Sequence, residues 1–191
     1  YMAPEDSRVA AFIGCGAQTP NQIKAVCAVR DVQRVNVFDL DRKRMLGICR
    51  DMQDYPVEIH PCIGLEECVG NADIVTTLTP ARGDGYLEHC MLKDTCHVNA
   101  VGADAKGKRE VRQSVLEGVD LIVYDEWEQC SHSGEIQYGS NTTMVPLATV
   151  VAGNGEHEGR QTLFDATGLA IEDVATARYI YDKIRNNIMC G

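Results

Sequence analysis

The sequence predicts an α/β fold in which helices and strands alternate around a doubly wound, mostly parallel sheet. Residues 9–13 form an unbroken apolar run, which is typical of a parallel strand in a sheet that helices cover on both faces. A glycine turn with Gly14 and Gly16 follows at once and leads into a helix-compatible run. The next strand, residues 34–39, ends in Asp39. This order is typical of a Rossmann-like unit, and we expect flanking helices and a long C-terminal helix around it.

The glycine turn has the chemistry of an anion site. Gly14 permits the tight turn, and Gly16 lets the backbone approach a pyrophosphate without a Cβ in the way. Pro20 suits the first turn of the next helix, whose free N–H groups and positive dipole end attract phosphate. Thr19 stands at the third fingerprint position, where glycine or alanine is usual. The turn alone therefore leaves open an α/β protein that binds no nucleotide.

Asp39 stands where a ribose-binding carboxylate belongs. It lies about twenty residues after the glycines, at the end of the second strand. A carboxylate there accepts hydrogen bonds from the ribose hydroxyls of NAD and repels the 2′-phosphate of NADP. The sequence therefore favours NAD, although Arg42 could accommodate the phosphate. A methyltransferase that binds S-adenosylmethionine uses a similar turn and acid, and this class also stays open here.

The composition fits one globular domain and excludes some partners. The chain has 191 residues, of which 45% are hydrophobic and 24% charged, as in a protein with a core. A formal net charge of −10 without a basic stripe argues against nucleic acid, because non-specific binding needs Lys and Arg to neutralise phosphates. No stretch resembles a membrane span or a signal peptide, so we expect a cytoplasmic protein without a membrane partner.

Nine cysteines raise the question of a metal or a disulfide framework. They contain no C-x-x-C pair, their number is odd, and several lie in apolar runs, where cysteine acts as a small hydrophobic residue. We interpret them as reduced thiols of a cytosolic protein. His89-Cys90 together with Cys96-His97 is the only metal-like cluster in the sequence. We interpret it as coincidence and expect no metal.

The elements after the second strand follow the same alternation. Asp41 is expected to cap a helix that runs to about residue 54 and carries one apolar face, with Met45, Ile48, Cys49 and Met52. A short strand at residues 57–60 and a brief helix at residues 65–70 follow.

The fourth and fifth strands are expected to frame the reaction centre. The fourth, residues 73–80, lies where doubly wound sheets reverse their order, so Thr77 and Thr79 are expected to point towards a cofactor; β-propensity alone would also explain them. The fifth, residues 96–101, opens into residues 102–110, which bring an acid, lysines and glycines to the carboxyl end of a central strand.

The last third of the chain is less regular. A helix, a strand and a partly helical segment are expected at residues 110–117, 120–125 and 126–139, whereas residues 141–158 give no clear signal. Residues 163–168 lead into a long helix, 169–188. Apolar residues recur at helical spacing on one of its faces, which we interpret as core: Val174, Ala177, Ile180, Tyr181, Ile184 and Ile188.

Three segments together resemble the ornithine cyclodeaminase, mu-crystallin and archaeal-type alanine dehydrogenase family. They are residues 13–18, residues 97–104 with 107–110, and residues 164–170 with Asp173. The resemblance implies that residues 1–191 are an NAD-binding Rossmann domain within a longer subunit, whose amino-terminal substrate and dimerisation region this chain lacks. Residues 163–191 would then be a C-terminal strand and helix that pack back on that region, and the apolar face of the helix is expected to be partly exposed where that region is missing.

The resemblance also implies the residues of the site. The glycine turn would lie on the pyrophosphate, and the cofactor-binding set would be Gly14, Gly16, Ala17, Gln18, Asp39, Thr79, Val98, Asn99, Ala100, Val101, Lys108 and Thr167. Asp104 matches the catalytic aspartate of the cyclodeaminases. Mu-crystallin-like members lack this acid, so it argues against a crystallin or ketimine-reductase reading. The alternative for Asp104 is the N-cap of a helix that begins near residue 106.

We therefore expect the full-length protein to be a homodimer that oxidises a small L-amino acid at Cα by hydride transfer to NAD, giving an imine. Asp104 would act as general base on the attacking amine or water. If the substrate's own amine attacks, ammonia leaves and the hydride returns, as in ornithine cyclodeamination. If water attacks, a keto acid and NADH leave, as in an alanine dehydrogenase. The remaining alternative is an NAD-binding module without catalysis, and we expect this fragment alone to be inactive.

Overall fold

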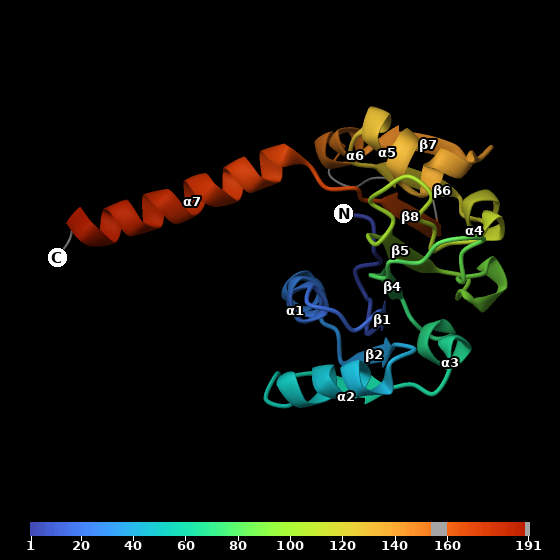
Figure 1. Ribbon diagram of the computed structural model, residues 1–191, viewed down its shortest axis with the longest axis horizontal. Coiled ribbons are helices and arrows are strands. Elements are labelled where there is room, and N and C mark those ends of the chain that lie inside the picture. Colours follow the sequence, from blue (N-terminus) through green and yellow to red (C-terminus); the bar gives the residue numbers. More distant parts are fainter. Residues whose placement is uncertain (154–159, 190–191) are drawn as a thin grey trace.

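The computed structural model describes residues 1–153 and 160–189, and their strands form one eight-stranded sheet (Figure 1). The strands lie in the order β3-β2-β1-β4-β5-β8-β6-β7. Their bounds are Val9–Ile13 (β1), Arg34–Phe38 (β2), Glu58–Pro61 (β3), Ile74–Thr77 (β4), Cys96–Ala100 (β5), Leu121–Tyr124 (β6), Thr143–Pro146 (β7) and Gln161–Asp165 (β8). All the paired strands that the structure describes are parallel. The predicted α/β, doubly wound class is confirmed.

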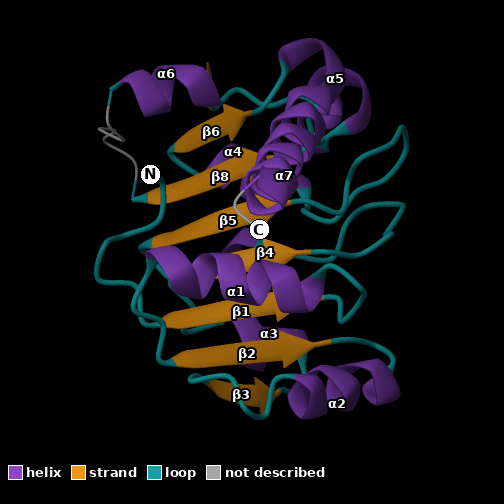
Figure 2. Ribbon diagram, turned by 90° about the vertical axis from the view of Figure 1, so that its left-hand side faces the viewer, coloured by secondary structure: helices purple, strands orange, loops and turns teal. Residues whose placement is uncertain are grey.

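Helices cover both faces of this sheet (Figure 2). The described helices are Thr19–Val29 (α1), Arg42–Asp51 (α2), Leu65–Val69 (α3), Gln113–Gly118 (α4), Trp127–Ser133 (α5), Leu147–Ala152 (α6) and Ala170–Met189 (α7), with 3₁₀ turns at His89–Met91 (η1) and Glu135–Tyr138 (η2). In Figure 2, α1 lies in front of β1 and β4, whereas α3 and α4 lie behind the strands. Side chains on both faces of β1 are therefore buried.

The unbroken apolar run of β1 has this physical reason. Phe12 belongs to the core cluster that contains Ile23 of α1, whereas Ala11 belongs to the cluster that contains Val69 of α3. Alternate side chains of a strand point to opposite faces, so a strand that is covered twice needs apolar residues at every position.

The order of the sheet reverses at β1, which pairs with β2 on one side and β4 on the other. The fourth strand therefore lies at the predicted switch point, where ligands of doubly wound sheets bind outside the carboxyl ends of the strands. The glycine turn, Asp39 and the segments after β4 and β5 all leave the sheet at this edge.

Several predicted elements differ from the structure. The helix expected at residues 110–117 begins only at Gln113, and Glu110 lies in a loop. Residues 106–112 form no helix, so the N-cap alternative for Asp104 is wrong. Residues 141–158 gave no signal but contain β7 and α6, with residues 154–158 outside the described part. β8 lies inside the sheet, between β5 and β6.

The prediction that the apolar face of the last helix is core is wrong for this chain. Figure 1 shows α7 extending away from the sheet. Its residues Val174, Ile180, Tyr181 and Ile184 are 66%, 49%, 59% and 55% exposed. Ala177 is exposed as well, and the side chain of Ile188 lies outside those described. An amphipathic pattern predicts burial only where a partner surface is present. Among the described helices, none is both long enough and apolar enough to cross a bilayer.

Candidate functional site

The turn after β1 requires glycine at one position and is open at another. Gly14 has φ of +98°, and its N–H donates to the carbonyl of Phe38 at 2.9 Å. A Cβ on Gly14 would lie 2.7 Å from the carbonyl oxygen of Leu78, so only glycine fits. A Cβ on Gly16 would meet nothing within 4 Å. The outer side of the turn is therefore accessible to a ligand.

Thr19 closes the turn from the inside. Its side chain is fully buried, and its hydroxyl donates to the carbonyl of Gly14 at 2.7 Å. The departure from the usual fingerprint thus leaves the outer side of the turn free. Within the described residues, the N–H groups of Gly16, Ala17 and Gln18 have no protein acceptor. Unpaired N–H groups at a helix amino terminus suit an anion such as pyrophosphate.

Asp39 is joined directly to this turn. One carboxylate oxygen accepts the N–H of Cys15 at 2.7 Å, and the other accepts the N–H of Asp41 at 2.7 Å. A carboxylate has about four acceptor positions, so each oxygen can still accept a ribose hydroxyl. Arg42 is exposed at the start of α2, one turn further on. The spacing that predicted a ribose carboxylate therefore corresponds to a real contact between the ends of β1 and β2.

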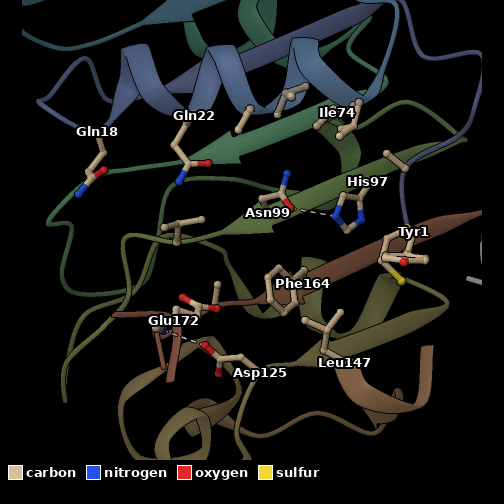
Figure 3. A pocket seen from close by; sticks show the side chains of 18 of the residues that line it. Tyr1, Gln18, Gln22, Ile74, His97, Asn99, Asp125, Leu147, Phe164 and Glu172 are labelled. Carbon is tan, nitrogen blue, oxygen red and sulfur yellow. Dashed lines mark hydrogen bonds between the residues drawn. The ribbon is translucent and has the colours of Figure 1, made fainter. Parts of the chain in front are cut away.

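A cleft of about 630 Å³ runs over the face of β4, β5 and β8 beside α1 (Figure 3). Figure 3 shows Gln18 and Gln22 on one wall, Asn99 and Phe164 on the floor, and Asp125 on the opposite wall. Predicted site residues that line it are Gln18, Asn99, Val101, Asp104 and Thr167. The structure thus brings together residues from the first turn, the fifth strand and the segment after β8.

Two residues of the predicted cofactor-binding set have side chains that do not reach the cleft. Val98 and Ala100 are fully buried in the core cluster that also contains Leu163. Asn99 between them faces the cleft, with its Oδ1 3.0 Å from Nε2 of His97 and its Nδ2 3.3 Å from Oγ1 of Thr76. Period-two alternation along β5 is the reason, and it was readable in the sequence.

The threonines at the end of β4 do not point into the cleft. Thr77 is fully buried, and its hydroxyl donates to Oε2 of Glu110 at 2.7 Å. The N–H of Thr79 donates to Oε1 of Glu110 at 2.6 Å, and its hydroxyl lies 2.7 Å from the same oxygen. The expectation that Thr77 faces a cofactor is therefore wrong. Sequence reasoning missed Glu110 because it placed this acid in a helix.

Asp104 and Lys108 lie together beyond the end of β5. They form an ion pair, with the carboxylate side chain half exposed in the cleft and the ammonium side chain 21% exposed. The carbonyl of Lys108 accepts the Tyr138 hydroxyl at 3.1 Å and the Gln137 amide at 3.3 Å, which fixes this loop to η2. A carboxylate and an ammonium group therefore lie together at the carboxyl edge of a central strand.

Thr167 is fixed by an acid that sequence reasoning assigned no role. Asp125, just after β6, accepts the N–H of Thr167 at 2.7 Å, its hydroxyl at 3.0 Å and the N–H of Gly168 at 2.8 Å. Asp125 also lines the cleft. The available signal was an acid at the end of a predicted strand.

The metal-like cluster that the sequence suggested does not gather as one site. His89 lies 2.6 Å from Oε1 of Gln161, whereas His97 contacts Thr162. A different group, His60, Cys62 and Glu67, places its ligand atoms within 4.8 Å of one another. Helix capping accounts for the acid of this group, because its Oε2 accepts the N–H of Ile63 at 2.8 Å at the start of α3. The eight described cysteines are free.

Comparison with known proteins yields one family and several relatives. The model of the ornithine cyclodeaminase/mu-crystallin family matches residues 1–187. Alanine dehydrogenase of Archaeoglobus fulgidus is 32% identical over 96% of this chain and 59% of its own length. An ornithine cyclodeaminase of Brucella suis is 35% identical over 97% of this chain and 53% of its own length.

Solved structures give the same picture. An archaeal alanine dehydrogenase dimer with bound NAD superposes with a TM-score of 0.87 at 31% identity, covering 98% of this chain and 60% of the other. The Thermococcus litoralis Δ1-pyrroline-2-carboxylate reductase in complex with NADH and L-proline gives 0.86 at 27%, covering 98% and 61%. The chain thus spans between 53% and 61% of the length of these four proteins.

Proposed function

The chain belongs to the ornithine cyclodeaminase/mu-crystallin family, and from that premise we propose that it is the NAD-binding portion of an enzyme that oxidises an L-amino acid at Cα. The observation that carries the proposal is the open glycine turn, tied to Asp39 at the switch point of the sheet. Relatives solved with NAD or NADH support the choice of cofactor. In this proposal, residues 1–191 are one part of a longer subunit, and two such subunits form a homodimer.

The residues present fit the cofactor. The unpaired N–H groups of Gly16, Ala17 and Gln18 would hold the pyrophosphate, and Asp39 would bind the ribose hydroxyls. Asn99 and Val101 would contact the part of the cofactor that lies over β5, and the backbone of Val98 and Ala100 would do so in place of their side chains. When bound, NAD supplies an acceptor for the hydride from the substrate α-carbon.

Three further residues of the predicted cofactor-binding set act in this proposal through their fixed positions rather than through free side chains: Thr79, Lys108 and Thr167. Each is already bound to an acid of the chain, and the three acids are Glu110, Asp104 and Asp125. Groups held by such bonds keep one orientation, which is what a site needs before a ligand arrives. Thr79 would therefore act mainly by shaping the crevice, by which we mean the space just outside the carboxyl ends of β4 and β5.

Asp104 would be the general base. Its carboxylate reaches the cleft and is oriented by the ammonium of Lys108. It would take a proton from the amine or water that attacks the imine carbon, a role that needs only hydrogen-bond reach to the attacking atom. In the cyclodeaminase outcome, which we favour, ammonia is released without net NADH. In the alanine dehydrogenase outcome, NADH and a keto acid accumulate.

Titration of the chain with NADH and, separately, NADPH tests this proposal. Binding would be followed by calorimetry and by fluorescence of Trp127, which is half exposed on α5. Saturable binding that prefers NADH is the expected result. Binding of neither nucleotide, by this chain and by a longer form that includes the amino-terminal part, would refute the proposal. Binding without amino-acid turnover in the longer form would favour a cofactor-binding module.

A further inference from the structure

Glu110 is a buried carboxylate between the ends of two central strands. Its side chain is fully buried, and five donors lie within 2.9 Å of its oxygens. Oε1 receives the N–H and hydroxyl of Thr79 and the hydroxyl of Tyr86, and Oε2 receives the hydroxyl of Thr77 and the N–H of Gly102. The carboxylate therefore links the segment after β4 with the segment after β5.

The two backbone donors explain why a carboxylate is needed. Hydroxyl groups can rotate and accept instead of donating, but a backbone N–H can only donate. Thr79 donates its N–H to one oxygen at 2.6 Å, and Gly102 donates its N–H to the other at 2.7 Å. An amide side chain has only one acceptor oxygen, so glutamine would leave one of the two N–H groups facing an NH₂ group.

The segments that Glu110 joins are packed without free space. A Cβ on Gly102 would lie 2.3 Å from the carbonyl oxygen of Thr79 and 2.6 Å from the carboxyl carbon of Glu110. The loop from Gly102 leads within two residues to Asp104, which lines the cleft. A shift of the carboxylate would therefore move the end of β5 and the proposed base with it.

From these contacts we infer that Glu110 is a positioning residue: it holds the carboxyl ends of β4 and β5 together and so sets the crevice of the NAD site. The inference rests on the function proposed above. Glu110 does not line the cleft, so it acts through Thr79 and Gly102 rather than by touching cofactor or substrate.

A second buried acid fixes Glu110 in turn. Oε1 of Glu135 accepts the N–H of Glu110 at 2.6 Å and that of Val111 at 3.3 Å. Asp165, the last residue of β8, accepts the N–H of Glu135 at 3.0 Å and that of Ile136 at 2.9 Å. The three acids thus form a continuous chain of contacts from the carboxyl end of β8 to the segments that follow β4 and β5.

The chain of acids is compatible with burial because it need not carry three charges. Burial is the main cause that raises the pKa of Glu135 to about 8 and the pKa of Asp165 to about 7. Both groups are therefore largely or partly protonated near neutral pH. Oε2 of Glu135 has no partner within the described residues, which agrees with a neutral carboxyl group there.

The test compares Glu110→Gln with a control variant, Glu117→Gln. Glu117 is an exposed acid on α4, and its replacement removes the same charge. Amide hydrogen exchange is measured residue by residue in the nucleotide-free chain, and NADH affinity is measured by titration. In Glu110→Gln we expect exchange at Thr79 or Gly102 to rise at least about tenfold and the Kd for NADH to rise about tenfold. In Glu117→Gln both should stay within about twofold of wild type.

The two readouts separate failure of this inference from failure of the proposed function. Unchanged exchange at both amides in Glu110→Gln overturns the inference, whatever the NADH result. Faster exchange with unchanged NADH affinity also overturns it, because the crevice would then not depend on Glu110. If neither the wild-type chain nor the longer form binds NADH while exchange behaves as expected, the link between the strand ends stands and the proposed cofactor falls.

A second pair of variants covers the case in which Glu110→Gln does not fold. Glu135→Leu removes the acceptor of the Glu110 N–H, so exchange should rise at Glu110 and at Thr79 or Gly102. Glu135→Gln keeps one oxygen that can accept the N–H groups of Glu110 and Val111, so its exchange rates should equal those of wild type. Equal exchange in the two Glu135 variants overturns the inference.

Discussion

Replacement of Gly14 by alanine is expected to destabilise the fold and to remove cofactor binding. At φ of +98°, a residue with a Cβ is strained by about 1–3 kcal/mol. The new Cβ would also lie 2.7 Å and 2.9 Å from the carbonyl oxygen and carbon of Leu78, and such overpacking against backbone adds about 1–3 kcal/mol. We therefore expect the free energy of unfolding to fall by about 3 kcal/mol, which in a chain of this size lowers Tm by about 10 °C.

Gly16→Ala is the matched control for this change. The same Cβ at this position meets no atom within 4 Å, so the free energy of unfolding should stay within about 0.5 kcal/mol of wild type. The Cβ would, however, occupy the open side of the turn, where the pyrophosphate must approach the backbone. Loss of NADH affinity without loss of stability is therefore the expected result for Gly16→Ala.

Urea denaturation, followed by circular dichroism and by Trp127 fluorescence, measures the stability of both variants, and calorimetry measures NADH affinity. The reasoning is refuted if Gly14→Ala unfolds at the wild-type urea concentration, because the backbone contact with Leu78 would then not restrict the turn. It is equally refuted if Gly16→Ala binds NADH as wild type does, because the turn would then not contact the pyrophosphate.

Three further outcomes are expected. Asp39→Ser should weaken NADH binding about tenfold. It should also reduce the preference for NADH over NADPH, because it removes the charge that repels a 2′-phosphate. An unchanged ratio of the two dissociation constants would contradict the role of Asp39 at the ribose. In the full-length protein, Asp104→Asn should lower turnover by about 10²-fold or more with NADH affinity within about twofold, and unchanged turnover would exclude it as the base. Because the pKa of Glu135 is raised from 4.5 to about 8, the folded state retains a proton that the unfolded state releases. The free energy of unfolding should therefore fall as pH rises from about 5 to about 8, at up to roughly 1.4 kcal/mol per pH unit for this group, and Glu135→Gln should flatten that slope in urea titrations.

Local patterns were enough to predict much of the fold. The apolar run before Gly14 predicted β1 with its bounds, and Asp41 caps α2 through its contact with the N–H of Lys43 at 2.9 Å. These features depend on residues close together in the sequence, where periodicity and capping act directly. The family and the α/β class followed from the same local motifs and are confirmed.

Other parts of the site were hidden because their partners are distant in the sequence. Glu110 contacts groups up to 33 residues earlier in the chain, and Asp125 binds Thr167 across 42 residues. No local pattern distinguishes such an acid from one on a surface helix. The buried side chain of Val98 is a different case, because simple alternation along β5 would have predicted it.

Apart from β7 and α6, the sequence by itself thus determined the order of strands and helices, and it determined the glycine turn and the acid that pairs with it. Only the tertiary structure decided that β8 lies between β5 and β6, that Glu110 joins two strand ends, and that the apolar face of α7 is exposed over its described side chains. The physical reason is that hydrophobic periodicity states which face of an element is to be buried. It does not state which other element will bury it, because that depends on contacts between residues far apart in the chain.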